Sequence, residues 1–151
     1  MNLAAIMTKD PVTVLQDESV GDAAAKLVLH RLTGLPVVDS EGRYLGLFGL
    51  YDFLALLLPR VALAGDLMSN LRFMNEDTEE LRRRYRDISG LPVSQFVNHN
   101  VPTLDPDTAE VDALRLFCRN QLSLPVVHEN SRNVQGIVSC WDAIRAITNS
   151  C

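Results

Sequence analysis

The sequence predicts an α+β protein built from two similar units, because two distinctive patterns each occur twice in the same order. Residues 35–38 and 124–127 are both Leu-Pro-Val-Val. Each is followed by an apolar run that begins with glycine and ends with an aromatic residue and aspartate, at 46–52 and 136–142. An internal repeat of this kind indicates two copies of one supersecondary unit.

The first copy is expected to form a strand, a helix, a β-hairpin and a second helix. Residues 12–15 are typical of a short strand, and 37–38 and 44–48 of the hairpin, with an apolar helix over 53–58. Ser19 or Asp17 is placed to cap the first helix, and Gly34 is placed to end it. Apolar residues at helical spacing predict its buried face: Val20, Ala23, Ala24, Leu27 and Val28.

The second copy repeats this order. Thr103 and Leu104 correspond to the first strand, and Asp107 is the expected helix cap. The hairpin is expected over 124–127 and 134–138, and the last helix over 141–148. The buried face of the first helix in this copy is expected to consist of Val111, Leu114, Phe117 and Cys118.

A connector separates the copies, so we predict repeats at 1–58 and 93–151 with the connector at 59–92. Its helix is expected to start within 75–78 and to end at Gly90, with acids first and arginines last, as the helix dipole favours. Glu79–Arg83 and Glu80–Arg84 have ion-pair spacing. Because the acids balance the arginines, a solvated connector is favoured over a nucleic-acid site.

Composition narrows the class of protein. The chain is 47% hydrophobic and 22% charged with a net charge of -5, which argues against general binding to nucleic acid or anionic membranes. Asp52 and Arg60 interrupt the apolar window 45–64, so it is not expected to span a membrane. The three cysteines form no CxxC pair, and the N-terminus lacks the pattern of a secretory signal. A cytoplasmic location is therefore expected.

Together these motifs resemble a tandem pair of cystathionine-β-synthase (CBS) domains, also called a Bateman module. The resemblance implies two β-α-β-β-α repeats packed sheet to sheet about a pseudo-two-fold axis, with two clefts between them. Such modules commonly bind adenosine compounds (AMP, ADP, ATP or S-adenosylmethionine) and regulate an attached or associated protein. Because no other domain is evident in this sequence, the resemblance implies either an effector protein in trans or a module that works alone. It also implies a homodimer, which we expect to use 53–64 and part of the last helix.

The ribose-binding signature of this family is a glycine, two apolar residues, Ser or Thr, two residues and Asp. The second copy matches it with Gly136, Ser139 and Asp142, whereas the first has Gly49 in place of the hydroxyl residue before Asp52. An ionised carboxylate can accept hydrogen bonds from both cis hydroxyls of a ribose. The alternative for Asp142 is a helix cap, which is common at such turns.

Other ligand contacts are expected around the signature. Segments containing Val101, Thr103, Ser123 and Pro125 are candidates for an apolar adenine slot, with Thr13 as the counterpart of Thr103. The run His-Arg-Leu-Thr-Gly-Leu-Pro at 30–36 resembles a stretch of the γ subunit of AMP-activated protein kinase. This likeness implies phosphate contacts for His30 and Arg31, whereas a solvated helix end is the alternative. Thr13 and Thr103 are equally compatible with plain strand positions.

Two other classes of protein remain open. An enzyme would need a nucleophile such as Cys140 beside a base such as His99 or His128, and no spacing in the sequence places them together. No cluster has metal-ligand spacing, so no metal and no required cofactor are expected. A structural or protein-interaction module with empty clefts is the second alternative, because the first signature is incomplete.

Overall fold

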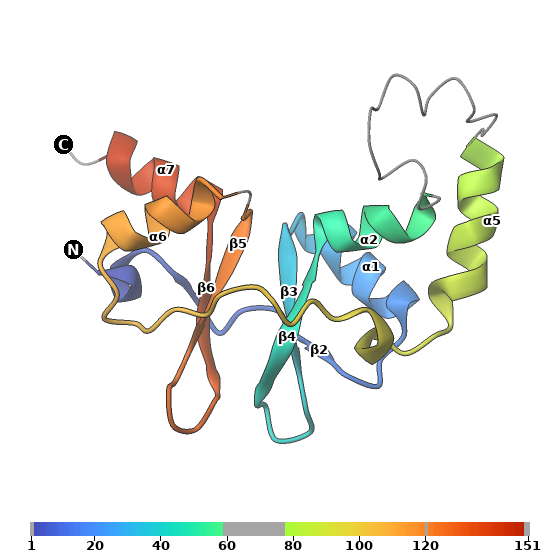
Figure 1. Cartoon of the computed structure of the whole chain (residues 1–151), viewed down its shortest axis with the longest axis horizontal. Coiled ribbons are helices and arrows are strands. Elements are labelled where there is room, and N and C mark those ends of the chain that lie inside the picture. Colours follow the sequence, from blue (N-terminus) through green and yellow to red (C-terminus); the bar gives the residue numbers. More distant parts are fainter. Residues whose placement is uncertain (1, 59–77, 120, 150–151) are drawn as a thin grey trace.

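Two three-stranded sheets stand side by side in the computed structural model, which describes residues 2–58, 78–119 and 121–149. One sheet has the order β2 (Val14–Leu15), β3 (Gly34–Val38), β4 (Tyr44–Gly49). The other has the order β1 (Thr8–Lys9), β6 (Val134–Ser139), β5 (Ser123–Val127). The helices gather at one end of the sheets, opposite the two hairpin turns (Figure 1). The α+β arrangement of two repeats is therefore confirmed.

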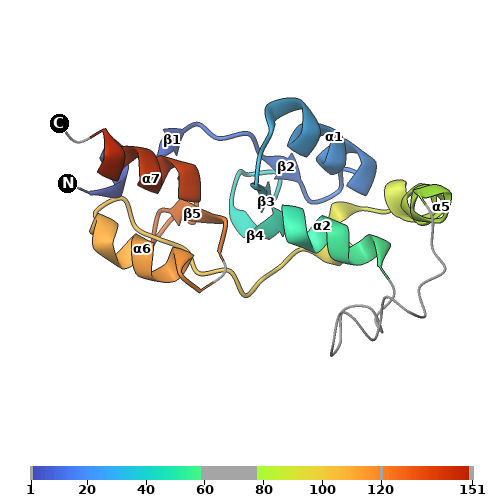
Figure 2. The same cartoon turned by 90° about the horizontal axis from the view of Figure 1, so that it is seen from above.

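The helices divide between the two repeats. Seen from above, α1 (Val20–His30) and α2 (Leu50–Leu57) lie beside one sheet, and α6 (Glu110–Phe117) and α7 (Cys140–Thr148) beside the other (Figure 2). The connector helix α5 (Thr78–Ser89) packs outside α1 and α2. Short 3-10 helices, η1 (Leu3–Ala5) and η2 (Val93–Phe96), stand at the beginning of the two repeats.

The first segment of each repeat crosses to the sheet of the other repeat. Thr8 in β1 pairs with Ile137 in β6, and Asn98, ninety residues later, pairs with Leu47 in β4. A glycine makes each crossing possible. A Cβ atom on Gly136 would lie 2.7 Å from the carbonyl oxygen of Thr8, closer than real Cβ contacts allow. The glycine that begins each repeated motif thus admits a crossing backbone.

Each repeat has its own apolar core. In the first, Val14, Leu35 and Phe48 are fully buried against α1, together with Val93 from beyond the connector. In the second, the fully buried residues are Leu3, Leu124, Val126 and Val138. Leu3 belongs to the N-terminal segment, so the crossing contributes to the core as well as to the sheet.

The buried helical faces are narrower than the sequence predicted. Val28 is 79% exposed, because it lies roughly 90° around α1 from the centre of the buried stripe. Val111 is 54% exposed, and Cys118 is exposed because α6 ends at Phe117.

Two predicted helix ends were also wrong. The cap of α6 is Ala109 rather than Asp107. Gly34 begins β3, and Arg31 ends α1 in the left-handed conformation, with φ of 52°. Ser19 does cap α1, since its hydroxyl accepts a hydrogen bond from the backbone N–H of Asp22 at 3.0 Å.

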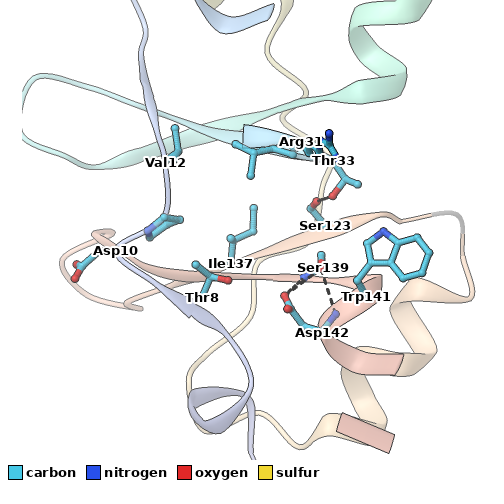
Figure 3. Close-up of a pocket in the computed structure, with 13 residues that line it drawn as sticks. Thr8, Asp10, Val12, Arg31, Thr33, Ser123, Ile137, Ser139, Trp141 and Asp142 are labelled. Carbon is cyan, nitrogen blue, oxygen red and sulfur yellow. Dashed lines mark hydrogen bonds between the residues drawn. The ribbon is translucent and has the colours of Figure 1, made fainter. Parts of the chain in front are cut away.

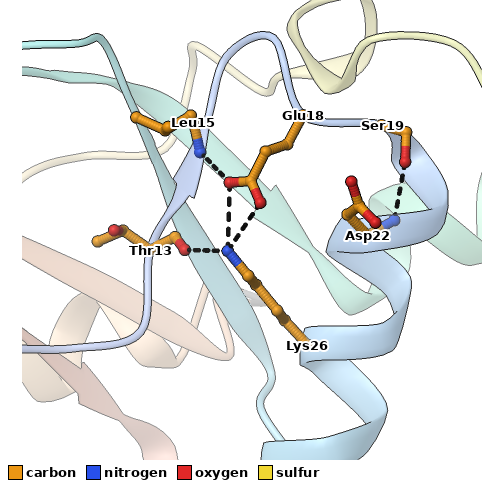
Figure 4. A network of polar contacts seen from close by, with 6 residues as sticks. All are labelled: Thr13, Leu15, Glu18, Ser19, Asp22 and Lys26. Carbon is orange, nitrogen blue, oxygen red and sulfur yellow. Dashed lines mark hydrogen bonds and ion pairs between the residues drawn. The ribbon is translucent and has the colours of Figure 1, made fainter.

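A polar network ties the first strand to α1 (Figure 4). The Lys26 ammonium donates to the Thr13 carbonyl oxygen at 2.9 Å and lies 3.2 Å from the Glu18 carboxylate. The same carboxylate accepts from the backbone N–H of Leu15 at 2.6 Å. The network therefore fixes the backbone that leaves the N-terminal crossing.

The connector helix α5 docks on α2. The rings of Phe53 and Tyr85 meet edge to face with centroids 5.9 Å apart, and Arg84 donates to the Leu57 carbonyl oxygen at 3.0 Å. The predicted Glu80–Arg84 pair forms at 3.7 Å, whereas Glu79 pairs with Arg82 and Arg86. The predicted start of this helix lies within 75–78, of which only Thr78, the first residue of α5, is among the described residues.

In the described ranges, no helix has both the length and the apolar character needed to cross a bilayer. The described part of the apolar window 45–64 forms β4 and α2, and residues 59–64 lie outside the described ranges.

Candidate functional site: two clefts between the repeats

The larger cleft lies where the N-terminal crossing meets both repeats, and we name it the Asp142 cleft. Its volume is about 210 Å³. Figure 3 shows Thr8, Ser139 and Asp142 on one side of it, with Val12, Arg31 and Thr33 across from them. The remaining lining residues are Asp10, Pro11, Leu32, Gly34, Ser123, Ile137 and Trp141.

The smaller cleft, the Asp52 cleft, is related to the first by the internal repeat. Its volume is about 120 Å³. Asn98, Gly49 and Tyr51 stand where the larger cleft has Thr8, Ser139 and Trp141, each ninety residues away. Its other lining residues are Thr33, Leu47, Leu50, Asp52, Val101 and Gln121–Ser123.

Asp142 is held by the start of its own helix. Its Oδ2 accepts hydrogen bonds from the Ser139 backbone N–H at 2.9 Å and from the Ser139 hydroxyl at 3.0 Å. The Ser139 hydroxyl in turn accepts from the backbone N–H of Asp142 at 3.2 Å, which completes a capping box. Ser139 is therefore the cap and Asp142 its partner in the first turn of α7.

The second carboxylate oxygen of Asp142 has a looser contact. Oδ1 lies 3.9 Å from the guanidinium Nη1 of Arg145, and the Asp142 side chain is 16% exposed. Because Oδ2 is fixed by the capping box, Oδ1 can accept hydrogen bonds from a molecule in the cleft. Capping and ligand contact, which the sequence presented as alternatives, are compatible in this geometry.

The two clefts share a hydroxyl pair. Thr33 lies in the loop between α1 and β3, Ser123 begins β5, and both residues line both clefts. Their hydroxyl groups are hydrogen-bonded to each other, and Ser123 is 3% exposed. Thr33 also approaches the Leu122 carbonyl oxygen at 3.4 Å.

The structure divides the predicted site residues between the clefts. Ser139, Asp142, Arg31 and Ser123 line the Asp142 cleft. Asp52 and Val101 line the other, together with Ser123. Val101 lies with Asp52, and not with Asp142, because the segment that carries it crosses to the first repeat.

Four of the predicted residues line neither cleft: Thr13, His30, Thr103 and Pro125. Pro125 is fully buried, and His30 is exposed at the end of α1. Thr8, Val12 and Trp141, in contrast, line the Asp142 cleft without having been predicted. The repeat could have identified this position, because an aromatic residue precedes the signature aspartate in both copies: Tyr51 in the first and Trp141 in the second.

The residues considered for catalysis lie apart. His128 follows β5 in the hairpin turn, whereas Cys140 begins α7 at the other end of β6. The Nδ1 atom of His99 contacts the Leu45 carbonyl oxygen at 2.9 Å. Within the described part of the chain, no three His, Cys, Asp or Glu side chains are grouped so that they could hold a metal ion.

The chain belongs to the CBS domain family, whose model matches residues 3–59 and 93–149. It resembles the CBS-pair protein CBSX2 from Arabidopsis thaliana, with 25% identity, a TM-score of 0.77 and coverage of 98% of this chain and 94% of that chain. A structure of CBSX2 in complex with AMP matches with a TM-score of 0.72, 25% identity and coverage of 98% and 96%.

Curated relatives include proteins much longer than this chain. An uncharacterised protein of Methanocaldococcus jannaschii is 28% identical over 95% of this chain, which spans 31% of that protein. Inosine-5'-monophosphate dehydrogenase of the same organism is 24% identical over 93% of this chain, which spans 22% of the enzyme. The sequence thus corresponds to one part of these relatives.

Proposed function

We propose that this CBS pair is a regulatory module that binds an adenosine-containing ligand in the Asp142 cleft. The proposed unit comprises repeats 1–58 and 93–151 joined by the connector 59–92. One observation carries the proposal: Ser139 and Asp142 of the complete signature line the larger cleft, with Asp142 Oδ2 held by Ser139 and Oδ1 able to accept further bonds. The AMP complex of the structurally similar CBSX2 supports it.

The lining of the cleft suits the parts of such a ligand. The ribose hydroxyls would donate to Asp142, since charge-assisted hydrogen bonds are the stronger ones. Val12 and Ile137 provide apolar surface for the adenine. Arg31 is the only cation among the described residues that line this cleft, where Asp10 and Asp142 are anions. This charge balance favours AMP over the more highly charged ATP.

We also propose that two copies of the chain associate through α2 and α7. Tyr51 and Leu54 on α2 are 63% and 44% exposed, and their repeat counterparts Trp141 and Ile144 on α7 are 64% and 50% exposed. Each helix therefore presents an aromatic and an aliphatic residue one turn apart. A surface that carries the same pattern twice suits a two-fold interface between identical chains. An effector protein in trans would then recognise the ligand-bound dimer.

A screen by thermal shift with AMP, ADP, ATP and S-adenosylmethionine tests the ligand proposal. A ligand at a hundred times its Kd should add about 2.7 kcal/mol to the free energy of unfolding. Titration calorimetry then compares the wild type with Asp142→Asn, which keeps an acceptor for the Ser139 N–H but removes the charge. Affinity should fall roughly tenfold or more, because a hydrogen bond to a charged group contributes about 1.5–3 kcal/mol.

Asp112→Asn is the matched control. Asp112 lies in the first turn of α6 and pairs with Arg115 at 3.3 Å, as Asp142 does with Arg145, but it does not line the cleft. Its substitution should leave affinity unchanged. If no adenosine compound binds the wild type at millimolar concentration, the ligand proposal is wrong and an interaction module with empty clefts takes its place.

A further inference from the structure

The two signature carboxylates have different partners although they occupy equivalent positions. In both, Oδ2 accepts from the backbone N–H of the helix cap, at 2.9 Å for Asp142 and 2.8 Å for Asp52. The Oδ1 atoms differ. Oδ1 of Asp142 lies 3.9 Å from the exposed Arg145 guanidinium, whereas Oδ1 of Asp52 accepts from the side-chain amide Nδ2 of Asn98 at 3.4 Å.

The backbone and the local turn fix the position of Asn98. Its backbone N–H donates to the Leu47 carbonyl oxygen at 2.8 Å, and its carbonyl oxygen accepts from the Leu47 N–H at 3.0 Å. Its side-chain Oδ1 accepts from the backbone N–H of Asn100 at 2.9 Å. The amide oxygen is thereby engaged on one side, and the amide NH₂ group faces Asp52.

The counterpart of Asn98 in the larger cleft is Thr8, ninety residues earlier. Thr8 pairs with Ile137 through its backbone, as Asn98 does with Leu47. Among the described residues, however, Thr8 makes no hydrogen bond to Asp142, and Figure 3 shows only Ser139 joined to this carboxylate. The Asn98 contact therefore distinguishes the two clefts.

We infer that Asn98 is an internal occupant of the Asp52 cleft: its amide takes the hydrogen-bonding position that a ligand hydroxyl takes on Asp142, so the chain binds one ligand. This inference rests on the proposed function of the Asp142 cleft. A ligand entering the Asp52 cleft must displace a group that is always present at high effective concentration. It also meets Gly49 in place of a serine and a smaller volume, about 120 Å³ against 210 Å³.

Exchanging residues between the clefts tests the inference. Asn98→Thr combined with Gly49→Ser gives the Asp52 cleft the threonine and the serine that the larger cleft has as Thr8 and Ser139. A Cβ atom on Gly49 would meet the movable Asp52 carboxylate at 2.9 Å, and φ of −94° suits serine. AMP should bind with a stoichiometry of one per chain in the wild type and two in the double variant. Adding Asp142→Asn to the double variant should leave only the new site.

The reverse exchange provides an independent variant that keeps the Asp52 cleft intact. Thr8→Asn brings an amide to the Asp142 cleft and should weaken AMP binding by roughly tenfold. Asn100→Thr is the control, because Asn100 is an exposed asparagine in the same segment as Asn98. It should leave both stoichiometry and affinity unchanged. Circular dichroism and the melting midpoint establish that each variant is folded.

A measurement without ligand separates this inference from the proposed function. The side-chain amide resonances of Asn98 should shift with Asp52→Ala and stay in place with Asp142→Ala. Unmoved resonances, two AMP molecules per wild-type chain, or a double variant that gains no site would each overturn the inference. Absence of binding by every adenosine compound in the screen would overturn the proposed function, and the amide resonances would still decide whether Asn98 contacts Asp52.

Discussion

The hydroxyl groups of Thr33 and Ser123 are hydrogen-bonded to each other where the two clefts meet. One residue comes from each repeat, and both line both clefts. Ser123 is buried, with 3% of its surface exposed. A buried polar group is tolerated when it is hydrogen-bonded, so this pair both joins the repeats and shapes the floor of the clefts.

Ser123→Ala should lower both stability and affinity for AMP. Removing one partner of a buried hydrogen bond costs about 0.5–1.5 kcal/mol, and Thr33 keeps only its longer contact of 3.4 Å with the Leu122 carbonyl oxygen. Urea unfolding and calorimetry measure the two effects. Ser94→Ala, at an exposed serine, is the control and should change neither. An unchanged unfolding midpoint for Ser123→Ala would contradict a supporting role for the pair.

The two signature aspartates should behave alike in stability and differently in binding. Each accepts the N–H of its helix cap, so Asp142→Ala and Asp52→Ala should each lose about 0.5–2 kcal/mol of stability. Asp142→Ala should also weaken AMP binding by at least about a hundredfold, because two ribose contacts are lost. Calorimetry decides: if only Asp52→Ala abolishes binding, the working cleft has been assigned to the wrong repeat.

Lys26→Met should destabilise the first repeat by roughly 1–2 kcal/mol, since the ammonium loses its bonds to the Thr13 carbonyl oxygen and to Glu18 (Figure 4). Glu18→Gln should cost less, because an amide oxygen can still accept from the Leu15 N–H. Lys9→Met, at an exposed lysine, is the control. Equal urea midpoints for Lys26→Met and Lys9→Met would show that the network adds no stability.

Tyr44 should make stability depend on alkaline pH. Burial raises the pKa of its phenol from 10.0 to about 12, although the Arg132 charge opposes the shift. Between these values the unfolded chain releases the proton while folded Tyr44 keeps it. The free energy of unfolding therefore falls as pH rises from 10 to 12, by up to about 2–3 kcal/mol.

The difference between the wild type and Tyr44→Phe isolates this effect. Among the described residues the Tyr44 hydroxyl has no hydrogen-bond partner, so Tyr44→Phe should be neutral or stabilising by up to about 1 kcal/mol at pH 7. Its advantage should widen above pH 10 in denaturant titrations. A constant difference across the pH range would contradict the assignment.

The internal repeat made the fold predictable, whereas the crossing of the segments was not. Leu-Pro-Val-Val and the following glycine motif identified β3, β4, β5 and β6, because strand and hairpin patterns are local. Thr8 pairs with Ile137, which lies more than a hundred residues later in the sequence. Local sequence patterns do not predict such a long-range contact. For that reason Val101 was expected beside Asp142, and Thr8 and Asn98 were not considered at all.

Exposed faces were the other difficulty. The apolar pattern of α1 extends to Val28 in the sequence, yet the helix buries only the narrower stripe that contacts the sheet. Trp141 and Ile144 are similarly apolar and exposed on α7. Apolar residues at helical spacing therefore predict a helix face that favours burial. They do not predict whether the chain's own core or a second chain buries it.

The proposed dimer would bury the exposed apolar residues of α2 and α7. Val28, on α1, lies outside the proposed interface. Light scattering should give about twice the chain mass of 16.8 kDa at micromolar concentration. Ile144→Asp should reduce the mass to that of one chain, because a carboxylate at the centre of an apolar interface would be buried without a partner. Val28→Asp, at a residue that is 79% exposed on α1, introduces the same charge outside the interface and should leave the dimer intact.

The single tryptophan gives this test a second readout. Trp141 is 64% exposed in the chain and also lines the Asp142 cleft, so its fluorescence should shift to shorter wavelength on dimerisation and change again when AMP binds. Ile144→Asp should abolish the concentration-dependent change and keep the AMP-dependent one, since Ile144 does not line the cleft. A wild-type mass of 16.8 kDa, with fluorescence independent of protein concentration, would refute the dimer and leave the ligand proposal standing.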